Sequence, residues 1–370
     1  MTRVGPAAVE TPIGYVDLGR VRSNAARIVA YASEHGLRWR PHVKTHKSLA
    51  IARIQLEAGA RGLTVATARE AEVMATVTDD LLVAYPPVGR GRIERLLALP
   101  AAVDAKVALD TPEALGPLAG AARAAGRTIG VLVEQDVGLG RVGLRGAEEV
   151  VALAARVAEA EGVDFRGILF YPGHIRMRET GQSRHVGRVS AALGATLELL
   201  AREGLEPEIV SGGSTPTLWR SHEVRGLTEI RSGSCIFNDR EALDVGVASA
   251  DDLAYTVLAT VVSDAVPGRA VVDAGSKALS KEARGGEGFG FVLEHPEVRV
   301  ASLSEEHGVL ELGSSDWAPT VGDRVRIVPN HVCVSVNLQD RLLARDGDEH
   351  RYVELEARGR GPWPRPRAEG

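Results

Sequence analysis

The chain has 370 residues, a net charge of -5, a pI near 6.1 and the composition of an ordinary folded protein. The weak negative charge and the absence of a long basic run argue against nucleic acid or a membrane surface as partner. Cys235 and Cys333 are its cysteines, which excludes a disulfide framework. With no apolar stretch at the N-terminus or of membrane-spanning length, these features predict a cytoplasmic protein.

One rhythm repeats eight times between residues 37 and 231, a short apolar run followed by an Ala- and Leu-rich helical stretch. The predicted strands are residues 37–43, 63–67, 81–85, 106–110, 129–135, 166–171, 208–211 and 228–231. Strict alternation indicates parallel βαβ units, and a count of eight indicates an α/β protein with a closed (β/α)8 barrel of the TIM type. A doubly wound sheet is the alternative, but no Gly-x-Gly-x-x-Gly follows the first strand.

The pattern changes near residue 250. The later apolar runs are residues 255–263, 270–273, 308–312, 324–328 and 332–338, joined by Gly, Pro, Asp and Ser turns. They predict a mostly-β domain. We therefore expect a barrel over 16–245 and a β domain over 246–357 that also takes in 1–15. Residues 358–370 are rich in Pro, Gly and Arg, which predicts a disordered tail.

Residues 40–47, Arg-Pro-His-Val-Lys-Thr-His-Lys, place Lys44 at the carboxyl end of the first predicted strand. Lysine is rare here, with five copies among 44 basic residues. In a barrel of this type, catalytic groups collect at that edge, and a lysine near other cations can lose its proton and form a Schiff base. The alternative is an exposed basic loop with two solvated histidines.

Polar residues follow the other predicted strands and should face the same barrel mouth. They are Thr67, Tyr85, Asp110, Gln135, Asp136, Arg141, Tyr171, His174, residues 211–215 and residues 231–234. Two Gly-Ser loops follow strands seven and eight, the position where such barrels often bind phosphate. Arg141 lies in a Gly-rich loop and either reaches into the mouth or pairs with Asp136 or Glu134. Tyr171 either stacks on a ring or caps the core.

His331 and Cys333 lie two residues apart in a predicted strand, hence on one face. An imidazole beside a thiolate suits a zinc-like divalent ion, although such a pair is also common as core packing. Two protein ligands form an incomplete shell, which is typical of a catalytic metal site and not of a structural one.

As a set, these motifs resemble the fold-type III pyridoxal phosphate enzymes, and within them the D-serine dehydratase and D-threonine aldolase family. The matching segments are residues 40–47, 65–72, 84–86, 138–143, 171–174, 211–216, 237–239 and 329–333. They span nearly the whole chain in family order. The family's architecture is an alanine racemase-like barrel with a C-terminal β domain, which agrees with the strand count.

The resemblance implies a role for each matched position. Lys44 would bind pyridoxal phosphate covalently, and Arg141 and Tyr171 would contact its ring or the substrate carboxylate. The phosphate would lie on Gly212, Gly213, Ser214, Gly233 and Ser234. His331 and Cys333 would bind a divalent ion, zinc or manganese, next to the substrate β-hydroxyl. Cys235 departs from the pattern, since many relatives have an aromatic residue there. The family also suggests a homodimer.

Two reactions on D-β-hydroxy amino acids share these residues. Loss of the β-hydroxyl converts D-serine to pyruvate and ammonia, whereas cleavage of the Cα–Cβ bond gives glycine and an aldehyde. Family members with His-x-Cys tend toward dehydration, so the resemblance implies D-serine dehydratase-like activity, with D-threonine aldolase as the alternative. A racemase needs a second base, for which Tyr255 is available without its usual Gly-Tyr-Gly-Asp context. A non-catalytic carrier with one barrel would end before residue 250.

Overall fold

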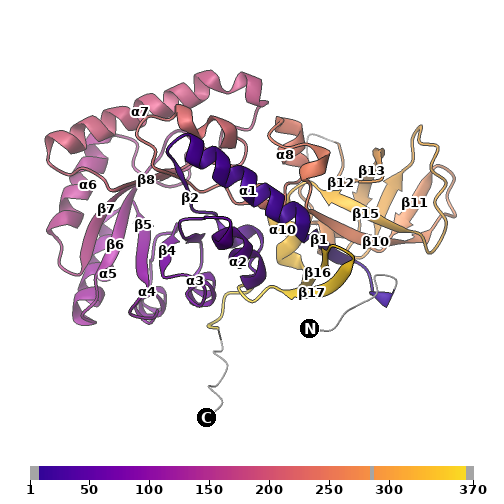
Figure 1. The fold of residues 1–370 in the computed structure, drawn as a ribbon, viewed down its shortest axis with the longest axis horizontal. Coiled ribbons are helices and arrows are strands. Elements are labelled where there is room, and N and C mark those ends of the chain that lie inside the picture. Colours follow the sequence, from indigo (N-terminus) through magenta and orange to yellow (C-terminus); the bar gives the residue numbers. More distant parts are fainter. Residues whose placement is uncertain (1–7, 284–286, 364–370) are drawn as a thin grey trace, which may run out of the picture. The chain divides into compact units, whose positions relative to one another are not determined.

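The computed structural model describes residues 8–283 and 287–363 (Figure 1). The chain forms two compact units, one of Met1–Ala25 with Ser234–Leu355 and the other of Ala26–Gly233 with Glu356–Gly370. The first is a β domain and the second a barrel, as predicted. The domain boundaries expected from the sequence, 16–245 and 246–357, stay a prediction. Among the described residues, no helix has the length and apolar character needed to cross a bilayer.

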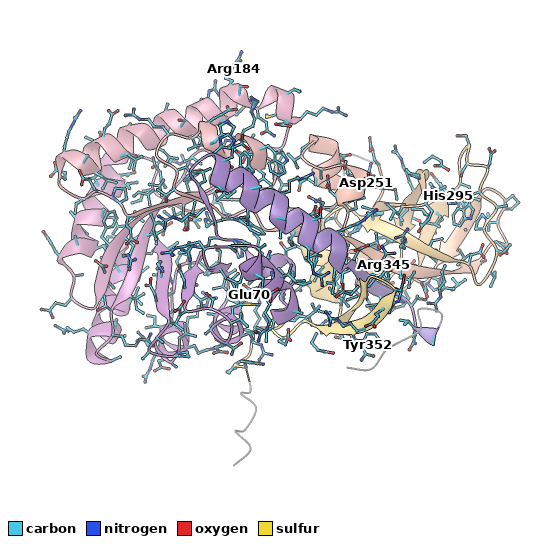
Figure 2. All side chains as sticks on the ribbon, in the orientation of Figure 1. Glu70, Arg184, Asp251, His295, Arg345 and Tyr352 are labelled. Atoms are coloured by element: carbon cyan, nitrogen blue, oxygen red, sulfur yellow. The ribbon has the colours of Figure 1, made fainter. Side chains whose placement is uncertain are left out.

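The β domain contains one sheet, whose described strands run in the order β11-β14-β13-β12-β15-β10-β1-β16-β17. They are β1 (Ile13–Asp17), β10 (Tyr255–Ser263), β11 (Arg269–Val272), β12 (Gly290–Val292), β13 (His295–Leu303), β14 (Gly308–Glu311), β15 (Arg324–Pro329), β16 (Arg341–Asp346) and β17 (Glu349–Glu354). The strand β1 pairs with β10 and β16. Arg345 of β16, labelled in Figure 2, donates to the Asp17 carboxylate at the end of β1 at 2.5 Å. The segment Ile13–Asp17, before the barrel, is therefore part of this sheet.

Short helices complete the β domain. They are η5 (Ser234–Ile236), α8 (Arg240–Val245), η6 (Ala250–Asp252), α9 (Ser276–Leu279) and α10 (Val332–Leu338). The predicted strand over 332–338 is wrong, because this segment is helix α10. Alternating valines favour a strand, but the Asp239 carboxylate accepts the Val332 N–H at 2.9 Å and caps the helix. Ser335 Oγ also donates to the Ala278 carbonyl at 2.8 Å. These tertiary contacts outweigh the weak local β-propensity.

The barrel sheet is parallel, and its described strands run in the order β2-β9-β8-β7-β6-β5-β4-β3. They are β2 (Arg38–Trp39), β3 (Leu63–Val65), β4 (Asp80–Val83), β5 (Asp104–Leu109), β6 (Ile129–Gln135), β7 (Val163–Phe170), β8 (Ile209–Gly212) and β9 (Glu229–Ile230). Beyond β2, the Pro41 carbonyl accepts the Thr64 N–H at 2.9 Å and His42 bridges Thr64, which joins the two ends of the sheet. All eight strands predicted from the sequence are present, although the first, predicted over 37–43, covers only Arg38–Trp39 and a 3-10 helix begins at Val43.

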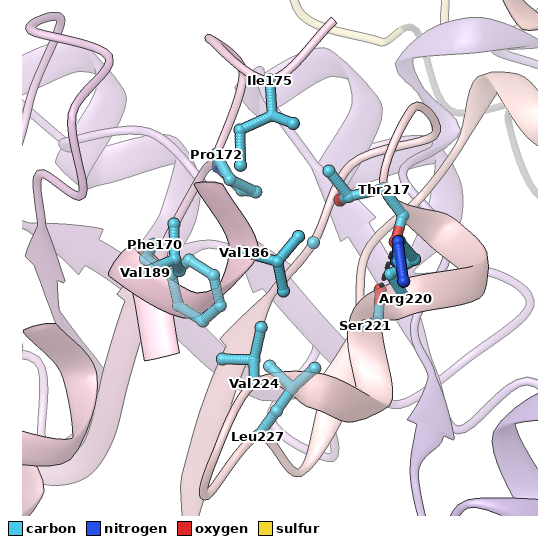
Figure 3. Close-up of a pocket in the computed structure, with 11 residues that line it drawn as sticks. Phe170, Pro172, Ile175, Val186, Val189, Thr217, Arg220, Ser221, Val224 and Leu227 are labelled. Atoms are coloured by element: carbon cyan, nitrogen blue, oxygen red, sulfur yellow. Dashed lines mark hydrogen bonds between the residues drawn. The ribbon is translucent and has the colours of Figure 1, made fainter. Parts of the chain in front are cut away.

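Helices alternate with these strands along the chain and surround the sheet (Figure 1). They are α1 (Leu18–Glu34), η2 (Val43–Thr45), α2 (Leu49–Glu57), α3 (Ala68–Met74), α4 (Arg90–Leu97), α5 (Pro112–Ala124), α6 (Ala147–Glu159), η3 (Glu179–Gly181), α7 (Ser183–Arg202) and η4 (Leu218–Glu223). Beneath α7 and η4, Phe170, Val186 and Val224 line an apolar cavity of about 10 Å³ (Figure 3). Such a volume is near the lower limit for one water molecule, so this cavity is a packing gap and not a ligand site.

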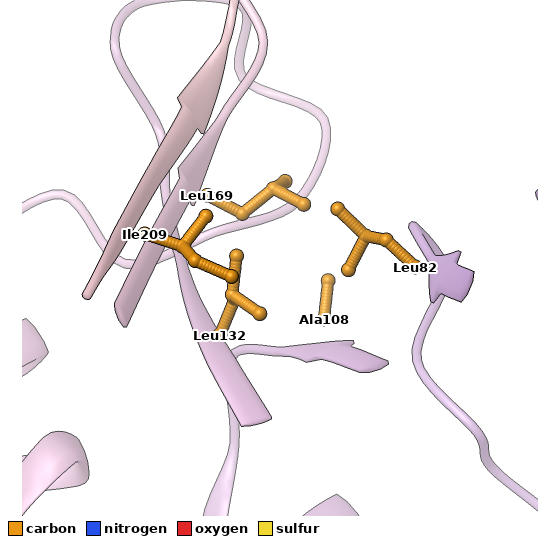
Figure 4. Close-up of a cluster of buried hydrophobic side chains, with 5 residues drawn as sticks. All are labelled: Leu82, Ala108, Leu132, Leu169 and Ile209. Carbon is orange, nitrogen blue, oxygen red and sulfur yellow. The ribbon is translucent and has the colours of Figure 1, made fainter. Parts of the chain in front are cut away.

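A layer of apolar side chains from consecutive strands fills the barrel interior (Figure 4). It consists of Leu82, Ala108, Leu132, Leu169 and Ile209, each buried. Burying one leucine-sized side chain stabilises a fold by roughly 1.5–3 kcal/mol. Asp110, Glu134 and Tyr171 each follow a residue of this layer by two positions, toward the carboxyl ends of the strands.

The sequence predicts disorder from residue 358, but the described part of this tail is held by hydrogen bonds. Arg95 Nη1 donates to the Arg360 carbonyl at 2.9 Å, and the Trp363 N–H donates to Glu72 at 2.8 Å. The tail therefore lies along α3 and α4 as far as Trp363. The remainder of the predicted disordered segment, 364–370, lies outside the described residues.

Candidate active site

The two lysines of the octapeptide have different surroundings. Lys47 has a left-handed φ of 53°, and its Nζ lies 2.5 Å from Oε1 of Glu70, which is fully buried. Lys44 is exposed on η2, with its Nζ 5.9 Å from the centroid of the Tyr171 ring. Among the described residues, Lys44 Nζ makes no hydrogen bond or ion pair. Lys47 is thus a structural cation, and Lys44 is the amine available for chemistry.

Both histidines of the octapeptide are buried, contrary to the alternative of a solvated loop. His42 accepts the Lys44 N–H at 3.4 Å. Burial is the main reason that the pKa of His42 lies well below the usual range, and the nearby charge of Lys44 lowers it further. His46 lies 3.0 Å from Gln55 Oε1 and accepts the Ser48 N–H at 3.1 Å. Burial lowers the pKa of His46 to about 3. Two neutral imidazoles therefore fix the backbone on either side of Lys44.

Arg141 lies near the same aromatic ring as Lys44. Its guanidinium carbon is 4.9 Å from the Tyr171 ring centroid, so Tyr171 has two cations close to its ring. Asp136 accepts the N–H groups of Gly138 and Gly140 at 3.0 Å each and pairs with Arg145 at 3.5 Å. Asp136 therefore does not pair with Arg141, which was one of the alternatives expected from the sequence. The structure brings Lys44, Arg141 and Tyr171 together.

The two Gly-Ser loops are packed too tightly for side chains at key positions. A Cβ at Gly212 would lie 2.1 Å from the Phe170 ring, and one at Gly233 would lie 2.4 Å from the His42 carbonyl oxygen. Gly213 has a φ of +87°, which only glycine adopts readily. The Arg231 N–H donates to the Gly212 carbonyl at 2.8 Å and connects the loops. The cradle thus lies against the octapeptide that carries Lys44.

The remaining predicted phosphate ligands differ in position. Ser214 is buried, with its Oγ 3.0 Å from Thr217 Oγ1. Ser234 is the first residue of η5 and belongs to the β domain by the division of the chain. Cys235 is the next residue in the sequence and is buried. It is the position that departs from the family pattern.

Two charged residues of the mouth were not among the predicted ligands. Arg231 is 6% exposed, and its Nη2 donates to the Phe170 carbonyl at 2.6 Å, while its Nε has no partner among the described residues. Glu134 is 4% exposed, and burial raises its pKa to about 6 despite the charges of Arg231 and Arg141. Glu134 and Arg231 each stand at the end of an apolar run that was predicted as a strand. That position was the only sign in the sequence that they would lie at the barrel mouth.

His331 and Cys333 belong to the β domain. His331 is the N-cap of α10 and Cys333 lies in its first turn, so the expected shared strand face is wrong, although their side chains are hydrogen-bonded. His331 Nδ1 lies 2.7 Å from Oε2 of Glu282. Burial alone would lower the pKa of His331, but the sulfur of Cys333 and the nearby carboxylates raise it to about 10. No group of three or more potential ligand side chains occurs among the described residues.

Tyr255 is fully buried, and its hydroxyl lies 2.9 Å from Ser335 Oγ. Burial also raises its pKa. A phenol in this position cannot exchange protons readily with a substrate, which argues against Tyr255 as the second base of a racemase.

The barrel has eight parallel strands, with a lysine after the first strand and glycine-rich loops after the last two, and a β domain follows it in the sequence. This combination defines the alanine racemase-like class. Residues 16–241 match the family described as "Alanine racemase, N-terminal domain", and residues 254–345 match the "Putative serine dehydratase domain". The chain belongs to the fold-type III pyridoxal phosphate enzymes related to D-threonine aldolase and D-serine dehydratase, as its motifs predicted.

Individual relatives cover nearly the whole chain. A D-threonine aldolase from Arthrobacter sp. is 34% identical over 95% of this chain and 94% of its own length. D-threo-3-hydroxyaspartate dehydratase from Delftia sp. (strain HT23) is 34% identical over 88% and 92%. The crystal structure of D-threonine aldolase from Filomicrobium marinum superimposes with a TM-score of 0.90 at 31% identity, covering 95% of this chain and 96% of that one.

Membership in this family implies pyridoxal phosphate, and the barrel mouth fits that group. It offers a lysine amine without a partner among the described residues. It also offers the exposed main chain of two loops whose glycines, Gly212 and Gly233, leave no room for a side chain. It also contains buried polar atoms that find no partner among the described residues, namely Ser211 Oγ, Ser232 Oγ and Arg231 Nε. Buried polar groups are normally satisfied, so this cluster indicates a ligand.

Proposed function

We propose that the chain is a pyridoxal phosphate- and divalent metal-dependent lyase of D-β-hydroxy amino acids, and that it dehydrates D-serine to pyruvate and ammonia. The observation that carries the choice of reaction is the hydrogen-bonded His331–Cys333 pair, an imidazole and a thiol in place of the His-x-Asp expected for aldolases. Its relatives are lyases of both kinds.

Lys44 is the residue proposed to hold the cofactor through Nζ and, once the substrate amine replaces it, to take the Cα proton. The unpaired position of Nζ at the mouth and the rigid backbone around it support both roles. When bound, pyridoxal phosphate supplies an electron sink for the charge left at Cα.

The other mouth residues would bind and orient. The N–H groups of Gly212, Gly213 and Gly233 suit a phosphate, and Ser214 and Ser234 add hydroxyls. Arg141 suits a carboxylate, since its planar fork matches two oxygens. Arg231 would donate a hydrogen bond to the bound cofactor through Nε, which has no partner among the described residues.

His331 and Cys333 would hold the divalent ion. Because Glu282 engages Nδ1, Nε2 is the His331 nitrogen left for a metal, beside the Cys333 sulfur. A divalent ion there supplies Lewis acidity toward the β-hydroxyl. A solved structure of a D-threo-3-hydroxyaspartate dehydratase with a cysteine replaced by alanine is in a metal-free form, and this agrees with the role proposed for Cys333.

The proposed reaction balances without a further co-reactant. D-Serine loses its Cα proton and its β-hydroxyl as water and leaves 2-aminoacrylate. Addition of water to the tautomeric imine then releases ammonia and leaves pyruvate.

Retro-aldol cleavage is the second candidate, because the two D-threonine aldolases match this chain as well as the dehydratase does. In that reaction the β-hydroxyl loses its proton, the Cα–Cβ bond breaks, and glycine and an aldehyde form.

The deciding experiment gives purified enzyme D-serine, D-threonine and D-3-hydroxyaspartate in turn, with the L-isomers as controls. Oxo acid is measured with lactate or malate dehydrogenase, aldehyde with alcohol dehydrogenase, and ammonia separately. We expect pyruvate and ammonia in equal amounts from D-serine. Glycine with aldehyde would favour the aldolase, and turnover of L-isomers alone would reject both candidates. The homodimer suggested by the family is tested on the same preparation by light scattering.

A further inference from the structure

A second cavity lies in the barrel unit, between α3, α4 and the C-terminal segment 356–363. Its volume is about 230 Å³. One wall is apolar, formed by residues such as Val83 and Leu96, and the rest carries Tyr85, Arg92, Arg95 and Arg360. Lys44, Arg141, Tyr171 and the glycine loops do not line this cavity, whereas Thr67 and Tyr85, which were expected at the barrel mouth, do line it.

The C-terminal segment is held firmly enough to form a wall. Arg69 donates to the carbonyls of Glu356 and Pro362 at 3.0 and 3.1 Å. The Ala357 N–H donates to the Lys47 carbonyl at 3.0 Å. This second attachment joins the segment to the octapeptide that carries Lys44. The C-terminal segment that forms one wall of the cavity is therefore attached to the barrel both near residue 357 and near residue 362.

The three arginines of the cavity differ in how their charges are balanced. Arg95 is fully engaged, with Glu72 at 2.6 and 2.9 Å and the carbonyls of Arg360 and Gly361 at 2.9 and 3.1 Å. The Arg92 guanidinium instead lies 5.0 Å from the centroid of the Tyr85 ring. In the described part of the chain no acidic side chain pairs with Arg92 or with the Arg360 side chain. The cavity thus carries two exposed guanidinium groups that no acidic side chain of the described residues pairs with.

We infer that this cavity binds a small organic carboxylate with a short apolar body. Two guanidinium groups suit a carboxylate, whereas Val83 and Leu96 suit hydrocarbon and would leave a fully hydrated anion such as phosphate poorly matched. A dry cavity of about 150 Å³ holds benzene, so this one has room for roughly six to nine non-hydrogen atoms. The inference does not depend on the proposed reaction.

Isobutyrate is the probe, because it has the required shape and lacks the amine needed to react at Lys44. Binding to the holoenzyme is measured by calorimetry and by ligand-detected NMR, with isobutyramide and inorganic phosphate as comparison ligands. We expect a dissociation constant in the millimolar range for isobutyrate and at least tenfold weaker binding of the other two.

The matched variants keep the main-chain contacts of the segment. Arg92→Gln with Arg360→Gln should weaken isobutyrate binding at least tenfold, and Arg360→Gln alone, which leaves the carbonyl that Arg95 binds, should weaken it at least threefold. Arg90→Gln on the same helix, where Arg90 pairs with Glu94 outside the cavity, should have no effect. Unchanged affinity in folded Arg360→Gln and double-variant proteins, or equal binding of isobutyramide, would overturn the inference. Preferential binding of phosphate would do so as well.

Discussion

The imidazole of His331 is held by Glu282, whose Oε2 lies 2.7 Å from Nδ1. A carboxylate behind a metal-binding histidine fixes the ring and its tautomer, and its loss typically weakens metal binding 10- to 100-fold. We therefore expect Glu282→Gln to lower zinc and manganese affinity by about this factor. The measurement is competition with a chromophoric chelator, which reads the metal directly and not through activity.

Glu354→Gln is the control for this variant, since Glu354 is an exposed carboxylate on β17 of the same domain. His331→Ala with Cys333→Ala should remove metal binding altogether. Metal affinity that is equal in Glu282→Gln and Glu354→Gln would show that Glu282 does not support the site.

Substitutions of Lys44 and Lys47 should have different effects, one on cofactor binding and the other on stability. Lys44→Ala should abolish the yellow colour of the bound cofactor. In protein freed of cofactor it should leave the free energy of unfolding nearly unchanged, because the Lys44 side chain is exposed. Lys47→Met leaves Glu70 buried without its cation, which costs about 3 kcal/mol or more. Visible absorbance of the bound cofactor and urea unfolding distinguish the two effects.

Lys47→Met combined with Glu70→Gln is the check on the second effect, because it removes the buried charge together with its partner. It should recover much of the lost stability. A Lys44→Ala protein that keeps its cofactor colour would disprove the assignment of Lys44.

The barrel was predictable because parallel buried strands and their helices leave a strong repeating pattern in the sequence. The helix at 332–338 was not, since its valines alternate as in a strand and its cap comes from Asp239, far away in the sequence. The sequence marked Lys44 through its position after a strand. It could not show that Lys47 is neutralised by Glu70 or that Arg231 is buried, because both depend on which segments the fold brings together.

Gly212 offers a test of the phosphate cradle. A Cβ at this position would lie 2.1 Å from the ring of Phe170, which is fully buried and cannot move away freely. We expect Gly212→Ala to weaken pyridoxal phosphate binding at least tenfold and to lower stability by about 1–3 kcal/mol through overpacking. Spectrophotometric titration of the apoenzyme measures the first effect and thermal unfolding the second.

Phe170→Leu should relieve part of the clash when combined with Gly212→Ala. Gly204→Ala is the control, since nothing lies within 4 Å of a Cβ there, although its φ of +70° adds backbone strain. If Gly212→Ala binds the cofactor as tightly as Gly204→Ala does, the cradle is not where the phosphate lies.

His46 makes a pH-dependent contribution to stability. Its pKa falls from the usual 6.5 to about 3, first because of burial and also because of the neighbouring Lys47 charge. The unfolded chain therefore binds a proton at His46 between these pH values and the folded chain does not. This contribution is complete above pH 6.5 and is lost as the pH falls toward 3. Between pH 6.5 and 5 the loss amounts to about 2 kcal/mol.

We expect His46→Asn to remove that part of the acid sensitivity, so that the stability difference between wild type and variant shrinks by about 2 kcal/mol from pH 6.5 to 5. His307→Gln, a change at an exposed histidine, should leave the pH dependence of stability as in wild type. Urea unfolding at several pH values measures both. A difference between wild type and His46→Asn that does not vary with pH would mean that the pKa of His46 is the same in the folded and the unfolded chain, which would contradict the expected effect of its burial.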